Sequence, residues 1–550
     1  MSRRDRVLVI GLDGGTFDVL DPRIRRGALP NLAALIRRGA RGTLRAVVPP
    51  VTGPNWVSMM TGVNPGRHGV FDFSRPAAGG RRIVHAGDIR ARTLWSVLHE
   101  QRKTIGVFNV PVTFPPAKVN GFMISGFLAP DARSGISHPP ELIDELRREN
   151  GEYLLDIDFL DVSREGRERL LRQLLASVEQ RGRNALYLMR KYDWDFFMAV
   201  FAETDRLFHA FWSLLEPPEG NGAEPADAAA RELAERCLAA VDAQVGALCA
   251  EAGDEATVLV VSDHGFGPLN GVFYVNRWLA DQGLLALKPE HTPPPRAGGA
   301  GQALRKAGRK LDILGLRRVL RRPAGRDGWT DRLARTFQSF HDRIDWGRTR
   351  AYYVAPSALG IHLNLQGREP HGIVRADEAE AVRSQVIAGL RSVRDPATGD
   401  PLVTHLFRRE EVFSGPYQAE SPDLFFFLRG LEVLASPDLA AREWFGPAEG
   451  KGTGYHRMEG MLIAAGSKVR AGMIDDAEII DVMPTVLHAL GLSVPDDLDG
   501  KVLEELFDPS FREAAPVQFA PAAAWAAAEA ALTPEEDAKV RERLQGLGYY

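Results

Sequence analysis

The sequence predicts an α/β fold in which a mostly parallel central sheet is flanked by helices. Continuous apolar runs rich in Val, Ile and Phe recur along the chain, as expected of strands buried on both faces of a parallel sheet. Longer stretches with helical periodicity separate these runs, which gives the alternation typical of this fold class. With 550 residues, of which 45% are hydrophobic, the chain can also build a large core.

Composition excludes several classes of protein. Lys and Arg total 68 against 72 Asp and Glu, so the net charge of −4 gives no reason to expect a nucleic-acid partner. Cys237 and Cys249 are the only cysteines, which excludes a disulfide framework or a thiolate zinc site. Both lie in a helical pattern and are expected in the core. The apolar run after the basic start is too short for a signal peptide, and no run of about 18 apolar residues exists, so we expect a cytoplasmic protein without a transmembrane helix.

The first strand is predicted at residues 6–12 and ends at Asp13. The loop that follows, DGGTFD, resembles the phosphate loop of sugar kinases. An aspartate at a strand end is also a common metal ligand, and Asp13 could equally cap the next helix. This stretch alone leaves all three interpretations open.

A helix at 31–41 and a strand at 42–48 lead into the proline-punctuated turn VVPPVTGPNW. Pro49, Pro50 and Pro54 prevent continued regular structure, so Thr52 is expected at a loop tip or at the start of the helical pattern resumed at 56–60. A hydroxyl at a helix N-terminus suits phosphate binding, but it also suits a simple N-cap.

The α/β alternation continues with a helix at 93–101, a strand at 103–109, mostly helical residues at 139–192 and a strand at 194–201. Asp205 and His209 follow four residues apart on a predicted helix, a spacing that suits either metal ligands or a surface pair. A helix at 225–253 precedes the strand at 257–261, which ends at Asp263 and His264. Asp13, Asp205 and Asp263 thus follow three predicted parallel strands, at the sheet edge where ligands bind.

Residues 268–345 break this rhythm and divide the predicted catalytic core into 1–267 and 346–510. Residues 301–350 hold 14 Lys and Arg against five Asp and Glu. We interpret the insert as a basic cap or lid that attracts an anionic substrate, with a solvated surface as the alternative. Residues 304–320 could also make peripheral contact with anionic lipid.

The second part of the core is predicted to contain sheet segments at 350–354, 359–364, 424–428 and 461–465, with helices at 377–391 and 480–490. His456 stands in a glycine-rich loop at 450–460, a setting that suits a ligand, although an isolated loop histidine carries little information. Residues 511–550 form a predicted helical appendage.

Six motifs occur in order: Asp13 after the first strand, V-T-G-P-N at 51–55, T-G-V-N-P-G-R-H-G at 61–69, T-D-R-L-F-H at 204–209, S-D-H-G at 262–265 and G-Y-H-R at 454–457. Together they resemble the alkaline phosphatase superfamily over residues 6–505. Within it, the chain is most similar to type I phosphodiesterases and nucleotide pyrophosphatases and to related phosphohydrolases or phosphomutases. A sugar kinase would not need the fourth and fifth motifs, and the absence of Cys or Ser at position 52 disfavours a sulfatase.

The resemblance implies an alkaline-phosphatase-like core and two divalent ions, Zn²⁺ or alternatively Mn²⁺. It implies that Thr52 attacks phosphorus to form a phosphothreonine intermediate, while Asn55 donates its amide to a phosphoryl oxygen. His68 is expected to fix the helix after Thr52. The implied ligands are Asp205, His209 and His456 for one ion, and Asp13, Asp263, His264 and the Thr52 oxygen for the other.

The expected function is therefore hydrolysis of a small anionic phosphoester, most simply a phosphodiester. A phosphomonoesterase or phosphomutase is the alternative, and a phospho-ligand binding protein without catalysis is a remoter one. The sequence leaves the oligomeric state open.

Overall fold

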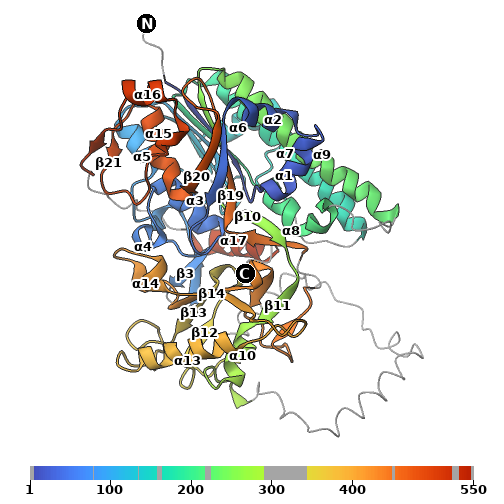
Figure 1. Ribbon diagram of the computed structural model, residues 1–550, viewed down its shortest axis with the longest axis vertical. Helices are drawn as coiled ribbons and strands as arrows, with labels where there is room; N and C mark the ends of the chain where they lie inside the picture. The colour runs from blue at the N-terminus through green and yellow to red at the C-terminus, as the bar shows by residue number, and fades with distance from the viewer. Residues whose placement is uncertain are drawn as a thin grey trace.

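The computed structural model describes residues 5–77, 80–133, 135–157, 164–216, 225–289, 343–448, 452–522 and 532–546. A nine-stranded sheet runs through the upper part of Figure 1, and the smaller sheets that contain β11 to β14 lie in the lower part. Residues 290–342, most of the predicted insert with its basic stretch and the segment 304–320, lie outside the described residues. The lid and lipid interpretations therefore remain predictions.

The nine strands of the large sheet follow the order β20-β2-β19-β9-β1-β8-β5-β6-β7. Only β19 and β7 run antiparallel to their neighbours, so the predicted mostly parallel sheet is confirmed. The strands are β1 (Val7–Leu12), β2 (Ala40–Arg45), β5 (Ile105–Val110), β6 (Gly121–Ser125), β7 (Ser137–His138), β8 (Phe196–Phe201), β9 (Thr257–Val261), β19 (Glu459–Ala465) and β20 (Gly472–Glu478).

Both faces of this sheet are covered by helices, which is why every residue of β1, β8 and β9 is buried. Side chains of β1 alternate between two apolar clusters, one on each face. One face carries α1 (Phe17–Arg25), α2 (Pro30–Arg38), α6 (Leu142–Asn150), α7 (Arg164–Lys191), α8 (Glu203–Leu215) and α9 (Pro225–Ala252). The other carries α3 (Thr52–Thr61), α5 (Leu94–Glu100), α15 (Val482–Ala489) and α17 (Pro534–Gly546).

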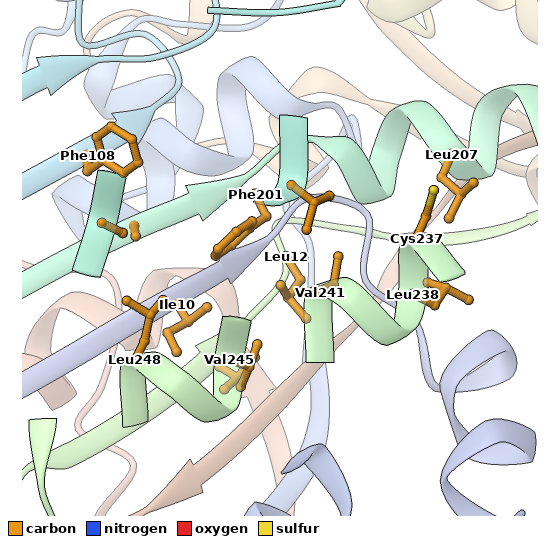
Figure 2. Close-up of a cluster of buried hydrophobic side chains, with 14 of the residues drawn as sticks. Ile10, Leu12, Phe108, Phe201, Leu207, Cys237, Leu238, Val241, Val245 and Leu248 are labelled. Carbon is orange, nitrogen blue, oxygen red and sulfur yellow. The ribbon is translucent and has the colours of Figure 1, made fainter. Parts of the chain in front are cut away.

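Figure 2 shows part of the apolar cluster on the sheet face that carries α1, α2 and α6 to α9, at the place where β1, β8 and α9 meet. Cys237 lies among these side chains and Cys249 is buried in the same cluster, so the predicted core placement of both cysteines is confirmed. Burial raises the pKa of each thiol to about 12, so neither forms a thiolate near neutral pH.

The described residues 271–289 and 343–446 lie outside the nine-stranded sheet and build smaller sheets with their own apolar cluster. One sheet contains β11 (Gly271–Tyr274), β16 (Val433–Ser436) and β17 (Phe445–Gly446). The other contains β12 (Ala351–Tyr353), β13 (Gly360–Leu363), β14 (Val403–Arg408) and β15 (Leu424–Leu428), with α10 (Val275–Asp281) and α13 (Ala379–Ser392) beside them.

The chain therefore rejoins the large sheet at β19, well after the predicted boundary at residue 345. The apolar pattern of β12, β13 and β15 correctly predicts strands, but strand periodicity does not indicate which sheet a strand joins.

The C-terminal helix α17 packs on the core, with Val540 and Leu544 fully buried in the cluster that contains α3. Arg541 donates a hydrogen bond to the carbonyl of Arg81, and Asp537 accepts one from the amide of Ile83. The predicted appendage is thus part of the folded core over these residues. In the part of the chain that the structure describes, no helix is both long and apolar enough to cross a membrane.

Candidate active site

Three aspartates meet at the carboxyl edge of the large sheet. Asp13 follows β1 directly, Asp263 is the second residue after β9, and Asp205 lies in the first turn of α8, which follows β8. These strands are adjacent, in the order β9-β1-β8, so the three loops converge above the middle of the sheet. Each of the three carboxylates is at most 1% exposed.

The first group at this edge contains Asp205, His209 and His456. The Nε2 atoms of the two histidines are 2.9 Å apart, and each is 3.4 Å from Oδ1 of Asp205. One ligand atom from each residue lies within 4.8 Å of the others. His456 comes from β18 (Gly454–Arg457), which pairs with β10 (Gly265–Pro268) and so joins the loop after β9. Its position in a strand differs from the predicted loop.

The second group contains Asp13, Asp263, His264 and Thr52. Nε2 of His264 is 3.3 Å from Oδ2 of Asp263, 3.7 Å from Oδ1 of Asp13 and 3.4 Å from the Thr52 hydroxyl. Asp205 also reaches this group, because one of its oxygens lies within 4.8 Å of ligand atoms of Asp13 and His264. The structure therefore brings all seven predicted metal-ligating residues together, with Asp205 between the two groups.

Each histidine presents Nε2 to the centre because its other nitrogen faces a backbone carbonyl. Nδ1 lies 3.2 Å from the Gly454 oxygen in His209, 3.0 Å from the Gly265 oxygen in His264 and 2.8 Å from the Pro50 oxygen in His456. Such a partner favours the tautomer with its proton on Nδ1 and leaves Nε2 with a lone pair, as metal-binding imidazoles require.

The buried carboxylates and imidazoles of the site favour the binding of cations. Burial, together with the charges of Asp263 and Asp205, raises the pKa of Asp13 well above its ordinary value, and burial raises that of Asp263 to about 8. Burial lowers the pKa of His456 to about 4 and depresses that of His264 strongly. Within the described residues, Oδ1 of Asp13 and Oδ2 of Asp263 are buried without a hydrogen-bond partner. Orphaned carboxylate oxygens beside neutral imidazoles fit divalent cations.

Thr52 is the first residue of α3, and Val51 occupies the N-cap. The capping interpretation of Thr52 is therefore wrong: its side chain lies inside the helix start and its hydroxyl faces His264 instead. Thr52 is fully buried, next to the free N–H groups of the first helical turn.

Asn55 makes its hydrogen bonds within the turn that carries Thr52, and its phosphate contact stays a prediction. Its Nδ2 donates to the carbonyls of Pro49 and Val51, at 2.9 and 3.0 Å, and its Oδ1 accepts from the Val47 amide at 2.7 Å. Both amide hydrogens are thus committed to the chain, and Asn55 fastens the turn that carries Thr52. The sequence could not reveal this, because a donor three residues after a nucleophile points equally well to either role.

His68 does fix the helix after Thr52, as predicted. Its Nε2 lies 2.9 Å from the Ser58 hydroxyl on α3, and its Nδ1 accepts a hydrogen bond from the Val70 amide. Burial lowers the pKa of His68 to about 3, so the ring is neutral and donates from Nε2 to Ser58.

Two further residues support the carboxylates and were not predicted. Trp56 donates its indole N–H to Oδ2 of Asp13 at 3.1 Å, and Arg206 contacts Oδ2 of Asp205 at 2.5 Å. Arg206 lies inside the T-D-R-L-F-H motif and Trp56 directly follows V-T-G-P-N, but only the fold shows which way their side chains turn.

An α/β sheet whose carboxyl edge gathers a buried threonine, three aspartates and three histidines has the features of a phosphoester hydrolase. The chain belongs to the type I phosphodiesterase/nucleotide pyrophosphatase family, whose model matches residues 7–438, and so to the alkaline phosphatase superfamily. Among curated proteins, none matches the sequence.

Solved structures with the same fold include phosphonoacetate hydrolase from Sinorhizobium meliloti 1021. Its complex with phosphonoformate is 16% identical to this chain, with a TM-score of 0.55, and its complex with phosphonoacetate is 15% identical, with a TM-score of 0.54. Both alignments cover 88% of this chain and 96% of that chain. Human ectonucleotide pyrophosphatase/phosphodiesterase 5 is 12% identical, with a TM-score of 0.47 and coverage of 92% and 100%.

Proposed function

We propose that this protein is a phosphodiesterase that uses two divalent metal ions and the Thr52 hydroxyl as its nucleophile. The observation that carries the proposal is the convergence of the Thr52 hydroxyl and the Nε2 atom of His264, 3.4 Å apart, with two carboxylate oxygens that are otherwise unpartnered in the described chain. Family membership supports the class of reaction.

The residues present would hold one ion with Asp205, His209 and His456, and the other with Asp13, Asp263, His264 and Thr52. Mixed imidazole and carboxylate donors suit Zn²⁺, with Mn²⁺ as the alternative. When bound, such ions would lower the pKa of the Thr52 hydroxyl and offset negative charge on the phosphoryl and leaving oxygens.

The chain's own residues organise the attack. The Thr52 hydroxyl loses its proton and its oxygen forms a bond to phosphorus as the bond to the leaving oxygen breaks. The leaving oxygen takes up a proton and departs as the first product, and the phosphothreonine keeps the second ester group. Water then attacks phosphorus, the bond to the Thr52 oxygen breaks, and the hydroxyl is restored. The N–H groups at the start of α3 are placed beside this oxygen and would donate to the phosphoryl oxygens.

The test compares a diester and a monoester that share one leaving group, such as bis(p-nitrophenyl) phosphate and p-nitrophenyl phosphate, on metal-loaded protein. We expect kcat/KM for the diester to exceed that for the monoester by about tenfold or more, a free-energy difference of about 1.4 kcal/mol. A reversed ratio would favour the monoesterase or mutase alternative. No hydrolysis of either ester, with two ions bound, would favour a binding protein. Phosphonoacetate is a third substrate to include, because it is bound in a structure of the same fold.

The nucleophile is tested with Thr52→Ala and Thr52→Ser. Alanine should reduce kcat by about 10³-fold or more at unchanged metal content, since it removes the attacking oxygen. Serine keeps the oxygen and should retain most of the activity. Acid quenching during turnover should add one phosphoryl ester to the peptide that contains Thr52, detected by mass spectrometry. Full activity of the alanine variant would refute the assignment.

A further inference from the structure

Arg206 is one of the largest fully buried side chains of the protein, and it stands next to Asp205 in the sequence. Its Nη1 donates to Oδ2 of Asp205 at 2.5 Å, and its Nη2 donates to Oδ2 of Asp156 at 3.2 Å. The guanidinium carbon lies 4.5 Å from the ring centroid of Phe127, which covers one face of the group. One planar cation thus joins two carboxylates from different parts of the chain.

This pairing decides how Asp205 faces the centre. Because Arg206 contacts Oδ2, it is Oδ1 that lies 3.4 Å from Nε2 of both His209 and His456. A carboxylate held through one oxygen presents the other in a fixed direction, which is how groups behind a metal ligand usually act on the metal. The same cation also offsets the negative charge of the buried Asp13 and Asp205.

Asp156 holds Arg206 in place on the side away from Asp205 through an ion pair. Asp156 lies in the segment that precedes α7, and its side chain is 9% exposed. Although burial opposes its ionisation, the charges of Arg206 and Arg543 hold the pKa of Asp156 below its ordinary value. Arg543 belongs to α17 and donates hydrogen bonds to the carbonyls of Ala129 and Pro130. The charge of Arg543 therefore acts on Asp156 from the C-terminal helix.

We propose that Arg206 is a positioning residue that orients Asp205 toward one of the two metal ions, an inference that rests on the proposed two-metal function. A lysine could neutralise the charge, but a single ammonium does not reproduce a planar fork that spans Asp205 and Asp156. The specific consequence is that Arg206 controls the affinity of the ion bound by Asp205, His209 and His456 more than that of the ion bound beside Asp263.

The experiment measures Zn²⁺ affinity of the metal-free full chain by competition with a chromophoric chelator. For wild-type protein we expect two sites. Arg206→Gln should weaken one site by about 10- to 100-fold and change the other by less than about threefold. Arg206→Lys should weaken the same site by a smaller factor. Asp156→Asn, which keeps Arg206 but removes the negative charge of its second partner, should weaken that site in the same direction and serves if the glutamine variant fails to fold.

Arg181→Gln is the matched control. Arg181 is also buried, 3% exposed, and pairs at 2.7 Å with Glu203, which lies in the same helix as Asp205 but outside both ligand groups. Its loss should lower the thermal stability of the metal-free protein and leave both affinities within about threefold of wild type.

Two results would overturn the inference about Arg206 but not the two-metal function. One is equal Zn²⁺ affinities of wild type and all the Arg206 and Asp156 variants, and the other is the same loss of Zn²⁺ affinity in the Arg181 control. Fewer than two sites in the wild-type protein would instead overturn the two-metal function, and the inference with it. The wild-type titration separates these failures.

Discussion

Replacing Asn55 with alanine separates the two roles that this side chain could have. In the structure Asn55 is fully buried and makes three hydrogen bonds to the backbone of the turn before α3. If each bond contributes about 1 kcal/mol, Asn55→Ala should lower the free energy of unfolding by about 3 kcal/mol. The loss should occur without metal or substrate, because all three partners belong to the chain.

The assay is urea unfolding of the metal-free protein, paired with steady-state kinetics of the metal-loaded protein. We expect kcat to fall as well, since the turn no longer holds the Thr52 oxygen in one place. Asn276→Ala is the control: Asn276 is equally buried and bonds to the Tyr353 amide and to the Tyr353 and Pro437 carbonyls, within the smaller sheets. It should cost similar stability with a smaller effect on kcat.

The reasoning would be refuted if the free energy of unfolding of Asn55→Ala differed from that of wild type by less than about 0.5 kcal/mol while KM for the substrate rose. That outcome would restore the phosphate contact expected from the sequence, because a ligand contact affects the complex and leaves the stability of the free protein largely unchanged.

Two further predictions concern the site and the sheet beneath it. The pKa values of Asp13 and Asp263 are raised in the folded metal-free protein, the latter to about 8. Above about pH 7 the buried histidines are neutral in both states, so these carboxyls make the folded state bind more protons than the unfolded state. Thermal unfolding of metal-free protein should therefore show stability falling as the pH rises from about 7 to 8, and Zn²⁺ should remove this dependence; a flat profile without metal would contradict it. Gly11→Ala should destabilise the fold by about 2 kcal/mol or more in urea unfolding, because its Cβ would lie 2.5 Å from the Trp56 ring, whereas Gly347→Ala, with only a contact at 3.5 Å, should unfold like wild type.

The sequence predicted the strands whose residues are buried on both faces, because a continuous apolar run is a strong local signal. It also placed Asp13, Asp205 and Asp263 near one another, since the carboxyl ends of parallel strands share one edge. The same reasoning could not assign β12 and β13 to a sheet, because pairing partners are distant in the sequence.

The interpretation of Thr52 as an N-cap failed because it depended on side-chain direction. For the same reason the sequence could not show that Asn55 hydrogen-bonds to the Pro49 and Val51 carbonyls. Arg206 was missed for the same reason, as nothing in a charged neighbour of Asp205 indicates whether it points to solvent or inward.

The position of β19 has a consequence for the order in which this protein becomes active. β19 lies between β9 and β2, and the strand pair joins residue 45 to residue 459. The turn after β2 is held from the same side, since the Ala46 amide donates to the Met458 carbonyl and His456 faces the Pro50 oxygen. Strands β9, β1, β8, β5 and β6 can pair without any of these residues, but such a partly folded chain has neither a fixed nucleophile nor His456. Pairing across so long a loop is slow relative to local contacts. Activity would therefore begin only when β19 has paired with β9 and β2. A measurement of activity would then follow completion of the fold more closely than a measurement of secondary-structure content.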